Sequence, residues 1–393
     1  MVIRLKKNKE KAVLNFHPWI FSGAIESVGK GITSGDTVAV HSFDGKFLAF
    51  GHFDSGSQIR VRLFSFDPNQ DGNEKEYWFS KWKSILQQKK DLLPKDTTGF
   101  RLFHSEGDGV PGIIVDVYER TAVLQLKTAG ALRLQEYLVS FLDEIGFEVI
   151  LEKREKADSK KTEEVIFYKG NASETIFKEN GIQFIADSTK GQKTGFFLDQ
   201  RENRSLLGKY SKDKVILNTF AYSGAFSVYA MLNGAKIVHS LDISKQALDL
   251  CERNLVLNGL SNCIEEQTHK SLVLDCFDYL KQMESNFYDI IILDPPAFTK
   301  NISTVMQASR GYKEINMRAI SKVKDGGLVF TFSCSQHISF DLFKKIIFGA
   351  AKDVKKKVRI LHHLTQSPDH GYSVYHPEGE YLKGLVIQVD GEI

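Results

Sequence analysis

VILNTFAYSGAF, residues 215–226, has the pattern of a buried strand that turns sharply into a helix. Its first three residues are apolar, and a loop of small residues containing Gly224 follows them. Three more apolar runs lie at residues 237–241, 289–293 and 328–332, with helix-like segments between them. Buried strands that alternate with helices predict a doubly wound α/β sheet in the C-terminal half of the chain.

Local signals mark the elements around this sheet. A helix is expected over residues 244–258, with Ser244 as its N-cap and Gly259 as its C-terminal stop. Earlier in the chain, Asn180-Gly181 separates two short apolar runs. This dipeptide favours a type I′ turn, because both central residues take positive φ, so a hairpin is expected there.

The N-terminal half has a different pattern. Short β-like runs at residues 38–40, 47–50 and 59–63, with glycine turns, predict a small barrel or sandwich that a polar linker ends near residue 72. Helices at residues 75–93 and 132–145 and strands at 112–115, 122–126 and 148–151 then predict a small α+β domain. The charged run at residues 153–161 is expected to be a solvated loop rather than an RNA-binding patch. The predicted domains are residues 1–72, 73–170 and 171–393.

Composition sets broad limits on function. Hydrophobic residues make up 42% and charged residues 26% of the 393 residues, as in ordinary globular proteins. No apolar run is long enough to cross a bilayer and the first residues do not resemble a signal peptide, so a cytoplasmic protein is expected. The four cysteines form no CxxC pair, and His362, His363 and His370 lack metal-ligand spacing, so no metal is predicted. A net charge of +3 permits a nucleic-acid partner without requiring one.

Ligands of open α/β sheets bind at the carboxyl ends of the strands, where several candidate residues lie. The loop at residues 218–226 lacks the GxGxxG and Walker patterns, and a plain tight turn explains it equally well. Asp242, at the next strand end, suits both hydroxyls of a ribose, although a carboxylate at a helix N-terminus is the alternative. Asp275 is a candidate acceptor for an adenine amino group.

Two further strand ends carry groups suited to chemistry on a base. Asp294-Pro-Pro combines an acid with a rigid turn whose carbonyls are exposed, which suits a base edge with an amino group. Cys334 stands between two serines at the last strand end, where a nucleophile and a buried core residue are equally good interpretations.

Together these residues resemble a known family, the large-subunit ribosomal RNA cytosine-5 methyltransferases of the RlmI type. HPWIFSGA at residues 17–24 resembles the start of that family's RNA-binding PUA domain, and FHSEGDGVPG at 103–112 the start of its central domain. GQKTGFFLDQR at 191–201 is the most specific match. The remaining matches are to its motifs I, IV and VI and to its C-terminal signatures, at Tyr222-Ser-Gly-Ala-Phe226, Asp294-Pro-Pro, Ser333-Cys-Ser335, Pro368-Asp-His370 and residues 377–383.

The resemblance implies a Rossmann-like class I methyltransferase domain, S-adenosylmethionine as cofactor, ribosomal RNA as substrate and a possible homodimer. Cys334 would be the nucleophile that attacks cytosine C6, and Asp294 would stabilise the ring. The base that removes the C5 proton is not identified, and His337 is a neighbour to test. The implied cofactor-binding residues are Phe220, Tyr222, Ser223, Gly224, Asp242, Asp275, Gln200 and Asp294. The implied substrate-binding residues are Pro295, Pro296, Phe298 and Lys193. Basic residues near the N-terminus are candidates for phosphate contacts or for a solvated surface: Arg4, Lys6, Lys7, Lys9 and Lys11.

Three positions depart from the family pattern. Asn218 replaces a common acid, Ala225 a second glycine and Ala297 a frequent lysine. Two alternatives therefore stay open: methylation of an exocyclic amine of adenine or guanine, which needs no cysteine, and a non-catalytic RNA-binding factor for ribosome assembly.

Overall fold

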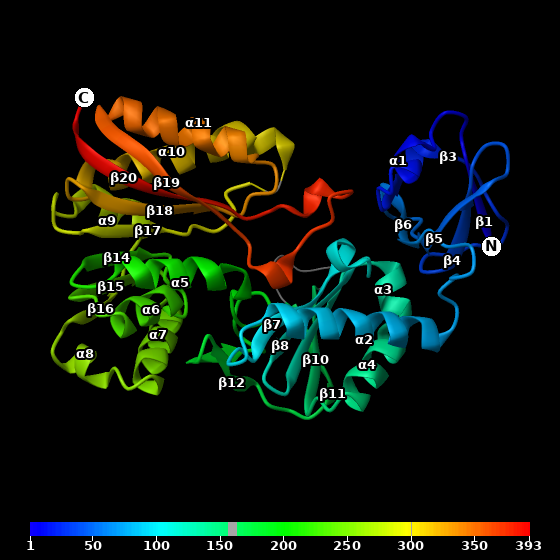
Figure 1. The fold of residues 1–393 in the computed structure, drawn as a ribbon, viewed down its shortest axis with the longest axis horizontal. Coiled ribbons are helices and arrows are strands. Elements are labelled where there is room, and N and C mark those ends of the chain that lie inside the picture. Colours follow the sequence, from blue (N-terminus) through cyan, green and yellow to red (C-terminus); the bar gives the residue numbers. More distant parts are fainter. Residues whose placement is uncertain (156–162, 300) are drawn as a thin grey trace. The chain divides into compact units, whose positions relative to one another are not determined.

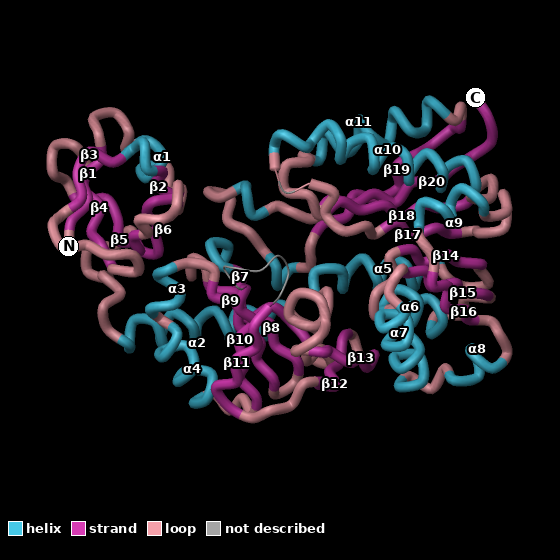
Figure 2. Tube along the Cα trace, turned by 180° about the vertical axis from the view of Figure 1, so that it is seen from behind, coloured by secondary structure: helices cyan, strands magenta, loops and turns pink. Residues whose placement is uncertain are grey.

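The computed structural model describes residues 1–155, 163–299 and 301–393. The chain divides into two compact units (Figures 1 and 2). Unit 1 comprises residues 1–181, 186–198 and 368–379, and unit 2 comprises residues 182–185, 199–367 and 380–393. Among the described residues, every helix is too short or too polar to cross a membrane. The predicted domain division at residues 72 and 170 stays a prediction.

Unit 1 begins with a six-stranded sheet in the order β2-β6-β5-β4-β1-β3. Its side chains alternate between the interior and the surface, and Ile3, Val38, Val40 and Val61 are fully buried in its core. The sequence predicted three of these strands and missed the shorter ones. The elements are β1 Val2–Leu5, α1 Lys11–Leu14, β2 Trp19–Phe21, β3 Ile25–Val28, β4 Thr37–His41, β5 Phe47–Phe53 and β6 Ile59–Ser65.

A five-stranded sheet in the order β11-β10-β9-β8-β7 follows in unit 1. Helix α2 packs Trp78 and Trp82 into its core, together with Phe103 and Phe141. The elements are α2 Lys75–Leu92, β7 Gly99–His104, β8 Ile113–Tyr118, β9 Thr121–Leu126, α3 Ala129–Arg133, α4 Gln135–Glu144, β10 Val149–Glu155 and β11 Glu163–Lys169.

Two predictions for this region need correction. The single helix expected over residues 132–145 is two helices that meet at Leu134, because the chain tightens there and the Leu134 N–H is shared between the carbonyl oxygens of Gly130 and Ala131, at 3.3 and 3.1 Å. The charged run expected to be a solvated loop begins inside β10, where Lys153 is buried and donates to the carbonyl oxygen of Gly191 at 2.5 Å. Residues 156–161 of that run lie outside the described residues.

The predicted hairpin is confirmed. Strands β12 Glu174–Glu179 and β13 Ile182–Asp187 form a two-stranded sheet, and both turn residues have positive φ, 51° at Asn180 and 80° at Gly181.

Residues 368–379 return late in the chain to complete unit 1. Inside that unit, the backbone N–H of Arg101 donates to the Asp369 carboxylate at 2.8 Å. Lys89 is buried and donates to the Asp369 carbonyl oxygen at 2.7 Å and to Asp108 at 3.0 Å. A segment about 170 residues beyond the rest of unit 1 therefore supplies one of the two partners of a buried ammonium group.

Unit 2 contains a seven-stranded sheet in the order β16-β15-β14-β17-β18-β20-β19, which confirms the predicted doubly wound fold. The first five strands in this order are parallel, and β20 lies antiparallel between β18 and β19. The elements are α5 Arg201–Tyr210, β14 Val215–Thr219, α6 Ala225–Leu232, β15 Ile237–Asp242, α7 Lys245–Leu257, α8 Ser261–Glu265, β16 His269–Val273, α9 Cys276–Gln282, β17 Ile290–Leu293, α10 Val305–Lys322, β18 Gly327–Ser333, α11 Phe340–Asp353, β19 Lys356–Thr365 and β20 Lys383–Glu392.

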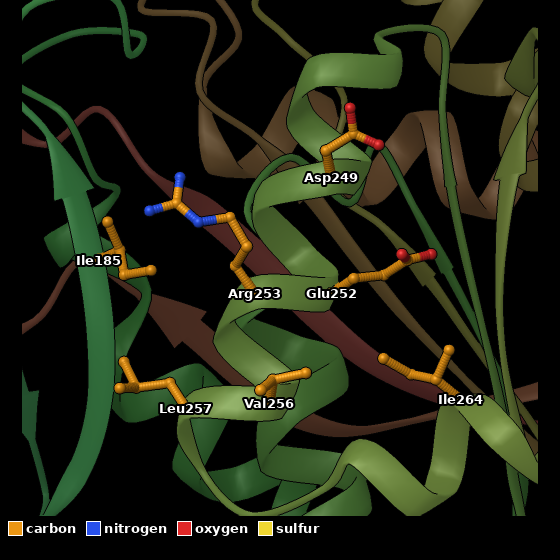
Figure 3. Close-up of a pocket in the computed structure, with 7 residues that line it drawn as sticks. All are labelled: Ile185, Asp249, Glu252, Arg253, Val256, Leu257 and Ile264. Carbon is orange, nitrogen blue, oxygen red and sulfur yellow. The ribbon is translucent and has the colours of Figure 1, made fainter.

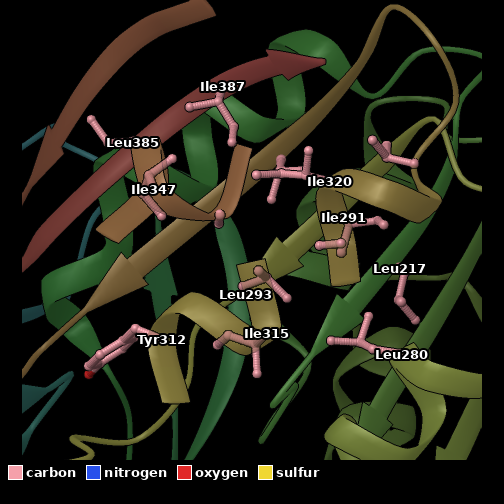
Figure 4. Close-up of a cluster of buried hydrophobic side chains, with 14 of the residues drawn as sticks. Leu217, Leu280, Ile291, Leu293, Tyr312, Ile315, Ile320, Ile347, Leu385 and Ile387 are labelled. Atoms are coloured by element: carbon pink, nitrogen blue, oxygen red, sulfur yellow. The ribbon is translucent and has the colours of Figure 1, made fainter. Parts of the chain in front are cut away.

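Helices cover both faces of this sheet, with α5, α6 and α7 on one side and α9, α10 and α11 on the other (Figures 1 and 2). On the second face, strand residues such as Leu217 and Ile291 pack against Leu280, Ile315 and Ile347 of the helices (Figure 4). Burial of each such side chain contributes about 1.5–3 kcal/mol. This core aligns the parallel strands, so that the loops following β14, β15, β17 and β18 meet at one edge of the sheet.

Candidate active site

The loop after β14 has an unusual backbone. Phe220, Tyr222 and Gly224 all have positive φ, at 54°, 46° and 71°. A non-glycine residue in this region costs of order 1–3 kcal/mol and persists only where the surroundings hold it. Here the N–H of Ala221 donates to the Leu241 carbonyl oxygen, and the N–H of Tyr222 donates to the Asp242 carboxylate, both at 3.0 Å. The end of β15 thus determines the shape of the predicted cofactor loop.

Gly224 is required by packing. A Cβ atom at this position would lie 2.0 Å from Sγ of Cys251 on α7. The sequence predicted Gly224 as a cofactor-binding residue, whereas the structure provides a packing reason for a glycine at this position. Ala225 begins α6 and does not have positive φ, so this backbone does not demand the second glycine usual at that position.

Asp242 is placed at the carboxyl end of β15, as expected. One carboxylate oxygen accepts from the Tyr222 N–H at 3.0 Å and the other from the Ser244 N–H at 2.9 Å. Each oxygen keeps a further lone pair, so the half-buried carboxylate can still accept from two hydroxyl groups. Ile243 follows it with 73% of its surface exposed, which provides an apolar surface beside this acceptor. These features fit the adenosine part of S-adenosylmethionine.

Asp275 is the N-cap of α9, where its side chain accepts from the backbone N–H of Asp278 at 3.1 Å. It is exposed at the end of β16, next to Leu274, whose side chain is also exposed. The predicted contact of Asp275 with the adenine amino group would use the carboxylate oxygen that does not take part in the cap.

Asn218 belongs to a buried polar network rather than to the surface of the loop. Its amide donates to Ser227 at 2.9 Å, and the Ser227 and Ser240 hydroxyls lie 2.7 Å apart. The Ser240 hydroxyl is in turn 2.8 Å from Nε2 of His269. Burial lowers the pKa of His269 to about 4. A neutral amide at residue 218 therefore joins β14 to α6 below the cofactor loop.

The ends of β17 and β18 bring Asp294-Pro-Pro and Cys334 together. Sγ of Cys334 lies 3.8 Å from the carbonyl oxygen of Pro295. Pro295 is buried and Pro296 is exposed, while Asp294 and Phe298 are half-buried. Of the four cysteines, all within the described residues, only Cys334 is not buried. The two segments that the sequence linked to chemistry on a base are thus neighbours.

The residue after Cys334 is held from several sides. The Ser335 hydroxyl lies 2.9 Å from the Tyr312 hydroxyl of α10 and accepts from the Thr299 N–H at 3.4 Å. The Tyr312 ring packs on Phe298 with 4.5 Å between ring centroids. Burial raises the pKa of Tyr312, so its phenol is neutral near pH 7. These contacts give the Cys334 turn a defined position next to the Phe298 ring.

The remaining predicted site residues have the following surroundings. Gln200 is buried, and its side-chain oxygen accepts from Asn203 at 2.6 Å. Lys193 belongs to unit 1, where its ammonium nitrogen lies 4.3 Å from the centre of the Phe197 ring. Ser223 is buried, and its carbonyl oxygen accepts from Asn254 at 2.9 Å. Half-buried His337 lies in the turn after Ser335. The roles predicted for these residues stay predictions.

Sequence reasoning missed Ile243, Tyr312 and Lys383. Ile243 follows the acid at the end of an apolar strand, and this position was the available signal. Lys383 is buried on β20 and donates to the Ser335 carbonyl oxygen at 2.8 Å. Its pairing partner on β18 follows from the fold, and the local sequence contains no sign of it.

A separate hollow of about 500 Å³ lies on α7, away from this edge of the sheet (Figure 3). Asp249, Glu252, Arg253, Val256 and Leu257 line it with Ile185 and Ile264. None of the predicted site residues lines it, so we do not assign it to the reaction.

Two family models match the chain. Residues 3–66 match a PUA-like domain, and residues 124–368 match S-adenosylmethionine-dependent methyltransferases. Over 98% of its length the chain is 38% identical to ribosomal RNA large subunit methyltransferase I of Shewanella amazonensis and 39% identical to that of Pseudoalteromonas atlantica, and it covers 99% of each.

Solved structures share the fold. A protein named as a SAM-dependent methyltransferase from Streptococcus mutans superposes with a TM-score of 0.83 at 23% identity, over 99% of this chain and all of that one. Another protein named as a methyltransferase, complexed with SAH, has a TM-score of 0.84 at 24% identity, with the same coverage.

Proposed function

We propose that this chain, which belongs to the S-adenosylmethionine-dependent methyltransferase family that includes ribosomal RNA large subunit methyltransferase I, forms 5-methylcytosine in large-subunit ribosomal RNA. Its cofactor is S-adenosylmethionine. The relatives' names support the RNA class, and the PUA-like domain supports RNA as the kind of polymer bound.

The observation that carries the cytosine proposal is the position of Cys334. Its sulfur lies 3.8 Å from the Pro295 carbonyl oxygen, at the edge where β17 and β18 end, and it is not buried. Transfer to an exocyclic amine needs no cysteine there, whereas methylation of a ring carbon gains from a nucleophile.

In the proposed reaction, the Cys334 thiolate forms a bond to cytosine C6, and electron density moves to C5. S-adenosylmethionine, when bound, supplies the methyl group that C5 receives. The C5 proton then leaves to a base or to water, the S–C6 bond breaks, and its electron pair returns to sulfur. Cys334 is regenerated as the thiolate, so the sulfur is neither oxidised nor reduced overall.

The acid-Pro-Pro turn would hold the base. Asp294 would accept from the cytosine amino group and balance charge that develops on the ring. Pro295, Pro296 and Phe298 would line the position of the base. A cytosine inside a helix cannot reach such a site, so the target nucleotide would be unpaired or flipped out.

Phe220, Tyr222, Ser223 and Gly224 would line the cofactor, with Gln200 nearby. The Asp242 carboxylate would accept from both ribose hydroxyls with its free lone pairs, and Ile243 would face the apolar adenine ring. Asp275 would contact its amino group.

Nucleoside analysis tests this proposal directly. Unmodified ribosomal RNA treated with the enzyme and S-adenosylmethionine should yield 5-methylcytidine on digestion and mass spectrometry. Cys334→Ala should bind the cofactor normally and yield none, while Cys263→Ala, the same change at a cysteine outside the site, should keep activity. Methylated adenosine or guanosine would instead support transfer to an exocyclic amine.

The covalent step has its own test. RNA containing 5-fluorocytidine at the target lacks the C5 proton whose loss releases the enzyme, so a complex stable in detergent should accumulate. Full activity of Cys334→Ala, together with no such complex, would exclude the covalent mechanism.

Two further expectations come from the sequence signals and from the family resemblance, respectively. We propose a cytoplasmic location and a homodimer. Fractionation of cells and sedimentation of the purified protein test them separately.

A further inference from the structure

Lys383 is the first residue of β20, the antiparallel neighbour of β18. The pairing register places it opposite Ser333, the residue that precedes Cys334. Only 2% of its surface is exposed. Ammonium groups are rarely buried unless a partner compensates for the loss of water, so this position needs an explanation.

Two hydrogen bonds hold the Lys383 ammonium group. Its nitrogen donates to the carbonyl oxygens of Ser335 and Tyr381, each at 2.8 Å. Because Ser335 directly follows Cys334, the ammonium group is fixed on the turn that carries the thiol. Two carbonyl dipoles compensate in part for burial of a full charge.

Electrostatic interaction links the two side chains. Burial lowers the pKa of Lys383 to about 8, and interactions with Cys334 and Glu380 act in the opposite direction. Such an interaction is mutual, because a negative sulfur that favours the ammonium form is favoured by that ammonium to the same degree.

We propose that Lys383 is a positioning residue whose buried ammonium group, fixed on the Ser335 carbonyl, keeps Cys334 in the thiolate form. This inference rests on the proposed role of Cys334 as nucleophile and adds the group that activates it. When the thiol ionises, the S–H bond breaks, the proton leaves to solvent and the electron pair stays on sulfur.

Other charged or titratable groups around Cys334 do not replace this cation. Asp294, at the end of β17, would oppose a thiolate when ionised. Tyr312, on α10, is a neutral phenol. His337 lies three residues after Cys334 in the same turn, and Glu380 lies three residues before Lys383 in the chain. Of these groups, only His337 can add positive charge, so His337→Gln is a necessary companion variant.

The pH profile of thiol alkylation tests the inference without RNA or cofactor. Iodoacetamide reacts with the thiolate, Cys334 is the cysteine that is not buried, and Cys334→Ala gives the background rate. Lys383→Gln keeps an N–H donor for the carbonyls but removes the charge, whereas Lys383→Arg keeps both. Circular dichroism and S-adenosylmethionine affinity check the fold of each variant.

We expect a midpoint below about 8.5, the value of a free cysteine, in the unaltered enzyme. Lys383→Gln should raise the midpoint by about one pH unit, about a tenfold loss of thiolate at neutral pH, and Lys383→Arg should stay near the original value. His337→Gln should shift it less than Lys383→Gln does.

An unchanged alkylation midpoint in folded Lys383→Gln would overturn the inference. A midpoint at or above about 8.5 in the unaltered enzyme would also overturn it, and this measurement needs no variant. The proposed function fails in a different way. If the midpoint moves but Cys334→Ala still methylates RNA fully, the effect of Lys383 on the thiol stands and the covalent mechanism does not.

Discussion

The carboxylate of Asp242 accepts a hydrogen bond of 3.0 Å from the backbone N–H of Tyr222, 20 residues earlier in the chain. The acid assigned to the cofactor ribose therefore also holds the strained loop that would line the cofactor.

Asp242→Ala should weaken S-adenosylmethionine binding more than the loss of ribose contacts alone would, because Tyr222 then loses the acceptor of its N–H. Bonds to a charged acceptor contribute about 1.5–3 kcal/mol each, so the affinity should fall by about 100-fold or more. Titration calorimetry measures it. Asp249→Ala, on the exposed face of α7 where the carboxylate pairs with Lys245, should leave the affinity unchanged. Equal effects of both variants would contradict the role of Asp242.

Gly224→Ala should destabilise unit 2. The added methyl group would overlap Sγ of Cys251 at 2.0 Å, in a backbone with φ of 71°. Gly259→Ala is a matched control, since its φ is 75° and no atom lies within 4 Å of the added Cβ. In urea unfolding, we expect the free energy of unfolding to fall by about 1 kcal/mol in the control and by about 2–4 kcal/mol in Gly224→Ala. Similar losses of stability in the two variants would mean that backbone strain alone, without the contact with Cys251, requires a glycine at residue 224.

His269 should make stability depend on pH. Burial lowers its pKa to about 4, below the usual 6.5, so the folded protein binds its proton less readily than the unfolded chain. Above about pH 6.5 His269 is neutral in both states and has no effect on stability. As the pH drops from there toward 4, the unfolded chain binds the proton first, so the free energy of unfolding falls by up to about 3 kcal/mol.

Urea unfolding of the unaltered protein and of His269→Gln at pH 7.5 and 5 measures this effect. The variant should lose less stability between the two pH values. His363→Gln, at an exposed position, should behave like the unaltered protein, and an unchanged slope in His269→Gln would refute the assignment.

Lys7 and Lys9, both exposed near the N-terminus, test the RNA contacts expected of the PUA-like domain. If each contacts a phosphate, Lys7→Gln with Lys9→Gln should reduce the slope of log affinity against log salt concentration by about 1.5. Filter binding over a range of salt measures it. Lys83→Gln with Lys245→Gln removes two charges elsewhere and should not change the slope.

Four of the five parallel strands in the sheet of unit 2 could be predicted because burial leaves continuous apolar runs, such as residues 289–293. Strand β16 escaped prediction since, at the edge of the sheet, it keeps polar residues such as His269 and Lys270. The division of the helix at Leu134 could not be predicted, because leucine is a good helix former and the local sequence contains no stop at that residue.

The candidate site, too, could be predicted only in part from the sequence. Asp242, Asp294 and Cys334 could be identified because each directly follows an apolar strand. Lys383 could not, because its relation to Cys334 passes through the pairing of β20 with β18, across some 50 residues of sequence. Gly224 was identified for a different reason from the one that packing gives.

The return of residues 368–379 to unit 1 has a consequence for synthesis on the ribosome. Lys89 and Arg101 must wait for Asp369 until about 170 more residues have been translated after residue 198. At about 5–20 residues per second, that delay is roughly 10 to 30 seconds. The first unit to emerge therefore stays incomplete until residue 379, only 14 residues before the end of the chain, and a messenger that stops before codon 368 leaves both units of the protein unfinished.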